Sequence, residues 1–361
     1  MSSLPTEGVK YAGSKRLLIP HILALAGKTG ARSVLDGFSG STRVAQAFAK
    51  TGYRVEANDI AEWSRIFGTC YLLNKREPGA YTDLLAHLNA VPPEDGWFTE
   101  HYGGDPENAD AEKKKPWQKK NTRRLDGIRN EIERLHLDEV EKAVALTSLM
   151  LALDRVDNTL GHFVSYLREW SPRSYGDLVL HEPAIFTQRE EHRVHQCDIF
   201  EVAPRSEVDI AYYDPPYGSN NEKMPPSRVR YAAYYHLWTT VCLHDKPPLF
   251  GAAARRGDTR DTGSSSVFES FRRDEAGRYS AVEAIGRVLQ TTRAPWVLLS
   301  YSSGGRASAE ELFELISHAG TLHEVRRIEH HRHVMSAMTW TGDWARGLSQ
   351  PHTEYLFLLK R

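Results

Sequence analysis

A strand–turn–helix–strand pattern in the first sixty residues constrains the fold more than any other feature. An apolar run from Ser33 to Phe38 is broken by Ser39-Gly40-Ser41, and the residues that follow have the apolar spacing of a helix. Gly52 stands where that helix would end, and Tyr53 to Ile60 has the composition of a second strand. This order is the first unit of a doubly wound α/β sheet, so we expect a Rossmann-like fold.

Strand signals stop after this unit and return only in the second half of the chain. Three later segments have the composition of strands: Val208 to Tyr213, Trp296 to Tyr301 and Glu354 to Leu359. Residues 75–190 are instead rich in Trp, Pro and charge, with helical stretches such as Asp138 to Val156. We therefore expect one α/β domain built from residues 1–74 and 191–361, with a mainly helical domain, residues 75–190, inserted between the two pieces.

Composition excludes several classes of protein. Of the 361 residues, 40% are hydrophobic and 26% charged, which is ordinary for an enzyme and excludes collagen, coiled coil and low-complexity disorder. A mean hydropathy of −0.51 without a long uncharged apolar run argues against a membrane span. The first residues lack the apolar core of a signal peptide. The 3 cysteines are far apart and typical of reduced thiols, so we expect a cytoplasmic protein.

The sharpest local signal is Asp214-Pro215-Pro216-Tyr217, directly after a predicted strand. Two prolines end the strand and stiffen the backbone at the carboxyl edge of the sheet, where open α/β sheets bind ligands. This arrangement suits an exocyclic amine on a flat base, because Asp214 and the Pro215 carbonyl can accept its two N–H bonds while Tyr217 stacks on the ring. A plain Pro-Pro turn after a strand is the alternative, and the four residues alone favour it less.

A second signal is the turn from Asp36 to Ser41. Its glycines allow a ligand to approach the backbone closely, and the helix that follows offers free N–H groups. About twenty residues later, Asp59 ends the next strand, where an acidic residue binds a ribose diol in dinucleotide folds. Together these features favour a cofactor that contains adenosine. No G-x-x-x-x-G-K-[ST] segment is present, which argues against a P-loop.

A basic, glycine-containing segment, Lys10 to Lys15, completes a recognisable order of motifs. With it, the sequence resembles the DNA adenine methyltransferase family, in which K-[WY]-x-G-[GS]-K, F-x-G, N-D, a target-recognition domain and D-P-P-Y follow one another. The resemblance spans about residues 10 to 240 and implies S-adenosylmethionine as the cofactor. The cofactor-binding residues that it implies are Tyr11, Lys15, Asp36, Gly37, Phe38, Ser39, Gly40, Asp59 and Asp198. The implied catalytic residues are Asp214, Pro215, Pro216 and Tyr217. One departure is Ser41, which stands where the family has glycine.

The reaction implied by this resemblance is methyl transfer to the 6-amino group of adenine in double-stranded DNA. The target atom is inaccessible inside a duplex, so the base must flip into the pocket. Three alternatives stay open: the 4-amino group of cytosine, an RNA substrate, and a regulatory protein that binds without catalysis. Asp rather than Ser at position 214 favours adenine. A cognate restriction endonuclease is a further partner compatible with this family.

The net charge of −1 does not indicate a nucleic-acid partner, but a local cluster of basic residues does. Seven basic side chains without an intervening acid surround Trp117, and we expect them to contact phosphates: Lys113, Lys114, Lys115, Lys119, Lys120, Arg123 and Arg124. A solvated loop is the alternative.

Three further groups of residues have open interpretations. The polar residues of 154–159 and 161–163 either read base edges or cap a helix, and the aromatic residues between Tyr231 and Trp238 are more typical of a core helix than of a base pocket. His330, His331 and His333 have no carboxylate or cysteine at suitable spacing, so no metal is expected.

Overall fold

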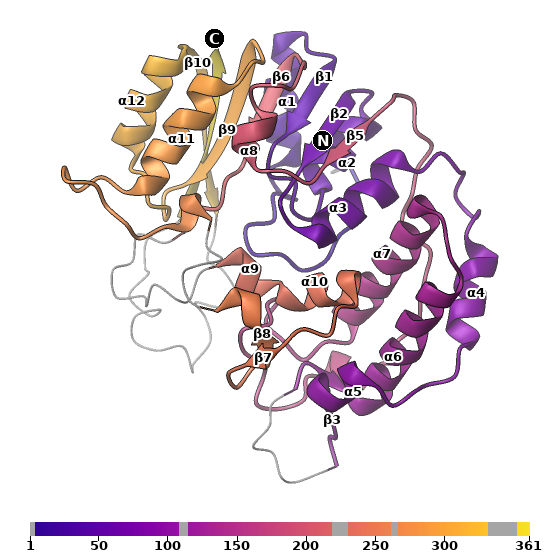
Figure 1. The fold of residues 1–361 in the computed structure, drawn as a ribbon. Helices are drawn as coiled ribbons and strands as arrows, with labels where there is room; N and C mark the ends of the chain where they lie inside the picture. Colours follow the sequence, from indigo (N-terminus) through magenta and orange to yellow (C-terminus); the bar gives the residue numbers. More distant parts are fainter. Residues whose placement is uncertain (1–3, 108–114, 219–229, 261–265, 331–351) are drawn as a thin grey trace.

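The computed structural model describes residues 4–107, 115–218, 230–260, 266–330 and 352–361. It is a mixed α/β structure around a seven-stranded sheet in the order β10–β11–β9–β6–β1–β2–β5 (Figure 1). The strands are β1 (Ser33–Asp36), β2 (Arg54–Asn58), β5 (Arg193–His195), β6 (Ile210–Tyr213), β9 (Trp296–Ser302), β10 (Thr321–His330) and β11 (His352–Lys360). All five strands predicted from the sequence are therefore confirmed within a few residues.

The sheet is mostly parallel, and its strand order reverses at β1. β1 pairs in parallel with β2 on one side and β6 on the other, so Val34 lies between Val55 and Ile210. β9 continues the parallel part beside β6, whereas β11 runs antiparallel between β9 and β10. In open α/β sheets the crevice at such a reversal, outside the carboxyl ends of the strands, is where ligands bind. Here that point lies between the ends of β1 and β6.

Helices cover both faces of the sheet because successive strand residues alternate between two apolar clusters. On one face Val34, Ile210 and Leu298 pack against α1 (Ile19–Ala26) and α2 (Arg43–Lys50). On the other face, Leu35, Ala211 and Val297 pack against three helices: α8 (Ile199–Val202), α11 (Ser280–Thr291) and α12 (Ala309–Ala319). The helix predicted before Gly52 is α2, and Gly52 follows its end in the left-handed conformation, at φ 89°.

The regular structure described in the long connection from β2 to β5 is mainly helical. It contains α3 (Glu62–Gly68) with a π-helical extension (Thr69–Leu73), α4 (Thr82–Ala90), α5 (Trp97–Tyr102), α6 (Lys119–Arg134) and α7 (Glu139–Arg155). Asp138 begins α7 with a capping box to Glu141.

One apolar cluster joins these helices to later elements. It also includes residues of α9 (Tyr231–Tyr234) and α10 (His236–Leu243), among them the buried Trp238. Two short pairs of strands complete the described chain: β3 (Gly103–Gly104) with β4 (Trp117–Gln118), and β7 (Leu249–Phe250) with β8 (Arg255–Arg256). The division of the chain at residues 75 and 190 stays a prediction. In the described parts of the chain, no helix has the length and apolar character needed to cross a membrane.

Candidate active site

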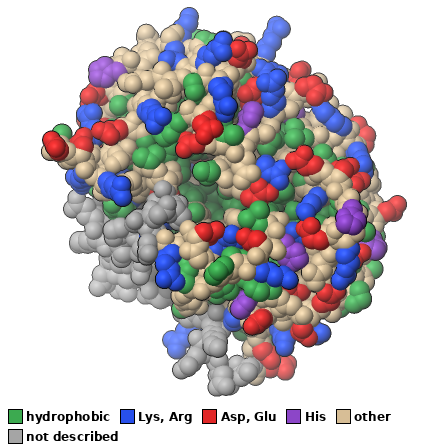
Figure 2. Space-filling view, viewed as in Figure 1, with side chains coloured by type: hydrophobic (Ala, Val, Ile, Leu, Met, Phe, Trp, Pro, Cys, Tyr) green, Lys and Arg blue, Asp and Glu red, His purple; other side chains and the backbone are tan. Residues whose placement is uncertain are grey.

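Three carboxylates gather at the carboxyl edge of the sheet, beside the reversal of strand order. Asp36 ends β1, Asp59 follows β2 and Asp214 follows β6, and each was a predicted site residue. They are close enough for the charges of Asp214 and Asp59 to raise the pKa of Asp36, in addition to the larger effect of burial. The face seen in Figure 2 is hollowed between α8 above and α9 and α10 below, with hydrophobic side chains in the hollow.

Asp214 has a partner on each of its carboxylate oxygens. Oδ2 lies 3.0 Å from the Lys15 ammonium, and Oδ1 accepts a hydrogen bond from the Tyr217 hydroxyl. Only 16% of the Asp214 side chain and 5% of the Lys15 side chain are exposed. Burial raises the pKa of Asp214 to about 6, against the attraction of Lys15 and with the repulsion of Glu354. The carboxylate is therefore ionised at neutral pH but poorly solvated, which makes it a strong hydrogen-bond acceptor.

The segment that contains Tyr11 and Lys15 is fixed by two tyrosines that follow the Asp-Pro-Pro-Tyr motif. The Tyr235 hydroxyl accepts the Ala12 amide at 2.7 Å, and the Tyr231 hydroxyl donates to the Ala12 carbonyl at 3.1 Å. The Tyr11 ring stacks on Tyr235 with centroids 4.8 Å apart. These contacts hold Lys15 over Asp214 and over the ring of Tyr217, 4.7 Å from its centroid.

The glycine turn after β1 is as tight as the sequence predicts. A Cβ on Gly37 would lie 2.6 Å from the Tyr213 ring. Gly40 has φ 47°, and a Cβ there would lie 3.2 Å from the Tyr11 ring. Ser41, which replaces the glycine of the family pattern, is buried. The residue of this turn with a left-handed backbone conformation after Gly40 is Thr42, at φ 59°, so position 41 does not require glycine. The departure at position 41 is therefore compatible with the turn.

Asp36 is a buried carboxylate without a hydrogen bond of standard geometry. It is 1% exposed, and neither Oδ1 nor Oδ2 has such a partner among the described residues. Burial raises its pKa well above the ordinary value. The backbone amides of Phe38 and Ala45 lie near this carboxyl and lower its pKa in part.

Asp59 and Asp198 are held by backbone amides at the same edge. Asp59 accepts the amides of Gly40 at 2.8 Å and Ala61 at 2.9 Å, and burial raises its pKa despite these bonds. Asp198 begins α8 and accepts the Phe200 amide at 2.9 Å. Asn58 ties the turns together, because it donates to the carbonyls of Gly37 and Cys197 at 3.2 Å each.

Four further residues belong to this site and were not among the predicted ones. Tyr231 and Tyr235 had a sequence signal, since their spacing of four puts both on one face of a helix. Ser300 on β9 and Glu354 on β11 both lie 3.4 Å from the Tyr217 hydroxyl. A glutamate beside the apolar run of β11 is the only sign of this contact in the sequence, because the contact depends on the pairing of β11 with β9.

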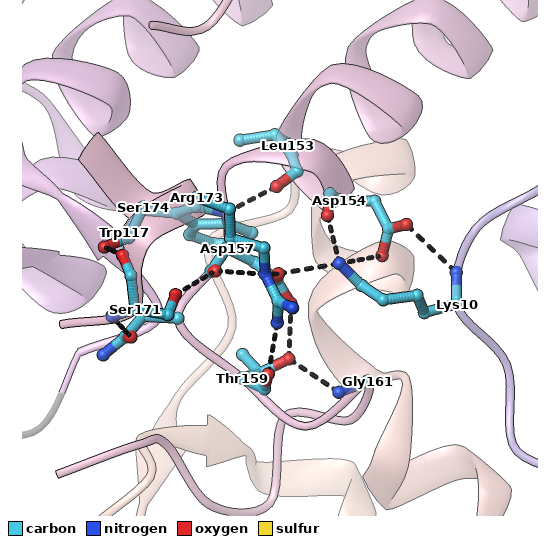
Figure 3. A network of polar contacts seen from close by, with 11 residues as sticks. Lys10, Trp117, Leu153, Asp154, Asp157, Thr159, Gly161, Ser171, Arg173 and Ser174 are labelled. Carbon is cyan, nitrogen blue, oxygen red and sulfur yellow. Dashed lines mark hydrogen bonds and ion pairs between the residues drawn. The ribbon is translucent and has the colours of Figure 1, made fainter. Parts of the chain in front are cut away.

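The polar residues after α7 form a structural network rather than an open surface (Figure 3). Asp157 is 1% exposed and lies between the Lys10 ammonium and the Arg173 guanidinium, each at 2.8 Å. Lys10 also contacts Asp154, whose pKa burial raises to about 6. Asn158 accepts the Ser171 amide at 2.8 Å. These contacts favour the helix-end interpretation over base reading.

Some of the described residues of the basic cluster bind other parts of the protein, and one is exposed. Lys119 is exposed, whereas Lys115 donates to the His101 carbonyl and Lys120 pairs with Asp177 at 2.6 Å. Arg123 pairs with Asp95 at 3.0 Å, and Arg124 donates to the carbonyls of Leu178 and Asn89. Lys113 and Lys114 lie outside the described residues. The DNA-binding role of the cluster stays a prediction.

The remaining open interpretations concern aromatic and histidine residues. Tyr235, His236 and Trp238 are fully buried, which agrees with the core interpretation of this aromatic segment. His331 and His333 lie outside the described residues, and within the described ranges no group of three potential metal ligands is found.

Comparison with known proteins identifies a family whose model matches the part of the chain that contains these residues. The model of the D12 class N6 adenine-specific DNA methyltransferase family matches residues 11–263, from Tyr11 past the Asp-Pro-Pro-Tyr motif. The chain is 27% identical to the modification methylase StsI of Streptococcus sanguinis, over 85% of this chain and 46% of that protein. It is 24% identical to the type II methyltransferase M.NlaIII of Neisseria lactamica, over 86% of this chain and 89% of that protein. It is 25% identical to the type II methyltransferase M.FokI of Planomicrobium okeanokoites, over 98% of this chain and 53% of that protein.

The chain thus spans about half the length of the StsI and FokI enzymes and most of the length of M.NlaIII. The family match covers well over half of the chain, including the three carboxylates and their partners. The chain belongs to the D12 class N6 adenine-specific DNA methyltransferase family.

Proposed function

We propose that this protein methylates the 6-amino group of adenine at a specific site in double-stranded DNA, with S-adenosylmethionine as methyl donor. The observation that carries the proposal is the desolvated Asp214 carboxylate, held by Lys15 at the point where the strand order reverses. Adenine's amine has its lone pair delocalised into the ring and is a poor nucleophile. A fixed carboxylate that accepts one of its N–H bonds favours a pyramidal nitrogen, whose lone pair can then be directed at the methyl group.

The residues at the edge of the sheet fit the proposed cofactor. Asp36 offers a buried carboxyl group beside the turn from Gly37 to Gly40, whose glycines let a ligand approach the backbone. Asp59 retains lone pairs for a ribose diol in addition to its two amide bonds. We assign Tyr11, Lys15, Asp36 to Gly40, Asp59 and Asp198 to this binding site. When bound, S-adenosylmethionine supplies an electrophilic methyl group on a sulfonium.

Asp214 and Pro215 orient the target amine in this proposal. The Asp214 carboxylate and the Pro215 carbonyl each accept one N–H, and Tyr217 stacks on the flipped base. Orientation of two reactants in this way can supply several kcal/mol of rate enhancement. Since the pKa of Asp214 is raised to about 6, the carboxylate is also able to take up a proton from the amine after transfer.

The helical part of the chain is the proposed target-recognition domain, residues 75–190, and the basic cluster on and before α6 is its proposed phosphate contact. This α/β architecture with one helical insertion is the methyltransferase arrangement that the family implies. We place the enzyme in the cytoplasm. A cognate restriction endonuclease is the proposed partner, because several relatives are named modification methylases or type II methyltransferases.

The test is transfer of a tritiated methyl group to mixed-sequence duplex DNA by wild type and by Asp214→Ala. We expect the variant to lose at least a hundredfold in rate, because the oriented acceptor is gone, while it still binds S-adenosylmethionine in calorimetry. Circular dichroism checks that the fold is retained. A folded Asp214→Ala variant with more than a third of wild-type activity would remove Asp214 from the reaction.

A further inference from the structure

A buried carboxylate outside the predicted set, Glu269, lies between two parts of the candidate site. It ends the 3₁₀ turn Val267–Glu269 and is 3% exposed. Its Oε1 accepts the Tyr231 amide at 2.9 Å, and its Oε2 accepts the Ser266 amide at 3.2 Å. Burial raises its pKa to about 7, against these two hydrogen bonds and the charges of two arginines. The carboxylate therefore joins its own turn to the first residue of α9.

The turn that carries Glu269 is fixed on the α/β part of the molecule. The Phe268 ring meets the Phe38 ring edge-on, with centroids 5.1 Å apart, and Phe38 belongs to the glycine turn after β1. The Arg306 guanidinium donates to the Glu269 carbonyl, and the Arg306 amide donates to the Tyr217 carbonyl at 3.1 Å. Glu269 is thus held beside both the glycine turn and the Asp-Pro-Pro-Tyr motif.

Tyr231 carries this fixation to the other side of the site. The α9 helix is a single turn, and a helix this short depends on contacts outside itself. The Tyr231 hydroxyl donates to the Ala12 carbonyl at 3.1 Å, and a Cβ on Gly13 would lie 3.1 Å from the same hydroxyl. The Gly13 carbonyl accepts the Lys15 ammonium at 2.9 Å, and Lys15 pairs with Asp214 at 3.0 Å. The position of Tyr231 therefore affects the position of Lys15.

We propose that Glu269 is a positioning residue for the cofactor-binding segment from Tyr11 to Lys15, on which it acts through Tyr231. The inference deepens the proposed function and rests on it, because it assumes that this segment binds S-adenosylmethionine. Glu269 holds the Tyr231 amide while Phe268 packs on the glycine turn, so the two parts of the binding site keep a fixed separation. Without the carboxylate, the segment adopts its binding arrangement less often, and the apparent affinity for the cofactor falls in proportion.

The experiment compares wild type with Glu269→Ala, Glu269→Gln, Tyr231→Ala and the double variant Glu269→Ala/Tyr231→Ala. We measure the Kd of S-adenosylmethionine by calorimetry at pH 8, where the Glu269 carboxylate is ionised. Glu269→Ala should raise Kd about tenfold, because it leaves the Tyr231 amide without this acceptor. The KM for the cofactor should rise by a similar factor, whereas kcat at saturating cofactor should change less than about threefold. Glu269→Gln keeps an acceptor oxygen and should bind at least about threefold more tightly than Glu269→Ala.

The double variant separates positioning from a general structural role. Tyr231→Ala removes the ring and hydroxyl that reach Ala12 but keeps the backbone amide that Glu269 binds. In this background, Glu269→Ala should raise Kd less than about twofold further, since the connection to the segment is already lost. Glu311→Ala is the matched control, because Glu311 accepts the Ser308 amide at 2.8 Å in the capping box of α12. It should bind the cofactor with the wild-type Kd.

Three results would overturn the inference: a wild-type Kd for Glu269→Ala, an equal rise in Kd with and without the Tyr231 side chain, or a Glu269→Gln variant that binds no more tightly than Glu269→Ala. Circular dichroism checks that each variant is folded. Tyr231→Ala leaves the carboxylate in place and should itself raise Kd about tenfold, so a wild-type Kd there overturns the inference even when Glu269→Ala does not fold. A wild-type protein that does not bind S-adenosylmethionine would instead overturn the proposed function, and calorimetry distinguishes the two failures.

Discussion

At the scale of single residues, the environment of Asp214 links burial to chemistry. A solvated carboxylate would be a weak acceptor, and a fully protonated one would offer a competing donor to the amine. Burial raises its pKa to about 6, while Lys15 keeps it ionised at neutral pH. The same residue is thus desolvated and charged, which is the state that an acceptor for an amine needs.

This pKa predicts the acid limb of the pH–rate profile. As the pH falls through about 6, Asp214 takes up a proton and loses an acceptor, so the single-turnover rate of methyl transfer should drop below that pH. The negative charge of Glu354 raises the pKa of Asp214. Glu354→Gln removes this charge, so the midpoint of the pH–rate profile should move to lower pH. Rapid-quench measurements between pH 5 and 8 test this, with fluorescence to check folding. A rate that is flat across the range would contradict the assignment.

A site residue can be predicted from the sequence when the signal for it lies in the residues next to it. Asp36, Asp59 and Asp214 could be placed from the sequence because each follows a strand, and parallel strands share a carboxyl edge. Glu354 could not, because its contact with Tyr217 spans 137 positions and depends on an antiparallel strand entering the sheet beside β9.

At the scale of elements, the segment from Lys10 to Lys15 connects the two parts of the molecule. Its first residue pairs with Asp157 beyond α7, its middle is held by Tyr235 after α9, and its last pairs with Asp214 after β6. Strand and helix positions follow from apolar periodicity. The path of this irregular segment does not, because it depends on these interactions with residues far along the chain as well as on the local turn at Gly13.

Asp157→Ala tests the strength of this connection. It removes the shared partner of Lys10 and Arg173, so the free energy of unfolding should fall by about 2 kcal/mol. This is less than for a fully buried pair, because the two cations are 36% and 39% exposed. The control is Asp177→Ala, whose partner Lys120 is 46% exposed, and which should change stability by less than about 0.5 kcal/mol. Urea unfolding measures both, and equal losses would contradict the ranking.

At the scale of the whole molecule, the sheet and the helical cluster are not independent. The apolar cluster of α4 to α7 also contains residues of α3, which follows β2, and of α10, which follows the Asp-Pro-Pro-Tyr motif. A composition change along the sequence cannot predict this, because it reports where segments differ and not which of them pack together. The helical part can therefore position the elements that carry the site, in addition to its proposed contact with DNA.

The contacts that Lys120, Arg123 and Arg124 make within the protein predict that these three cations contribute little to phosphate binding. Replacement of Lys113, Lys114 and Lys119 by Gln should make the slope of log K against log salt less negative by nearly 3, because each phosphate that is neutralised contributes about −0.9 to the slope. Arg124→Gln is the matched control, since Arg124 already donates to two backbone carbonyls. It should lower the free energy of unfolding by about 1–3 kcal/mol and leave the slope unchanged. A triple variant with the wild-type slope would assign the cluster to a solvated loop.

Methylation of adenine in DNA by this site is the central claim. The most direct measurement is to incubate the protein with tritiated S-adenosylmethionine and mixed-sequence duplex DNA, digest the product and identify the labelled nucleoside. We expect label in the N6-methyladenine nucleoside alone, and its disappearance in Asp214→Ala. Label in the N4-methylcytosine nucleoside, or no label from a protein that binds the cofactor, would contradict the claim.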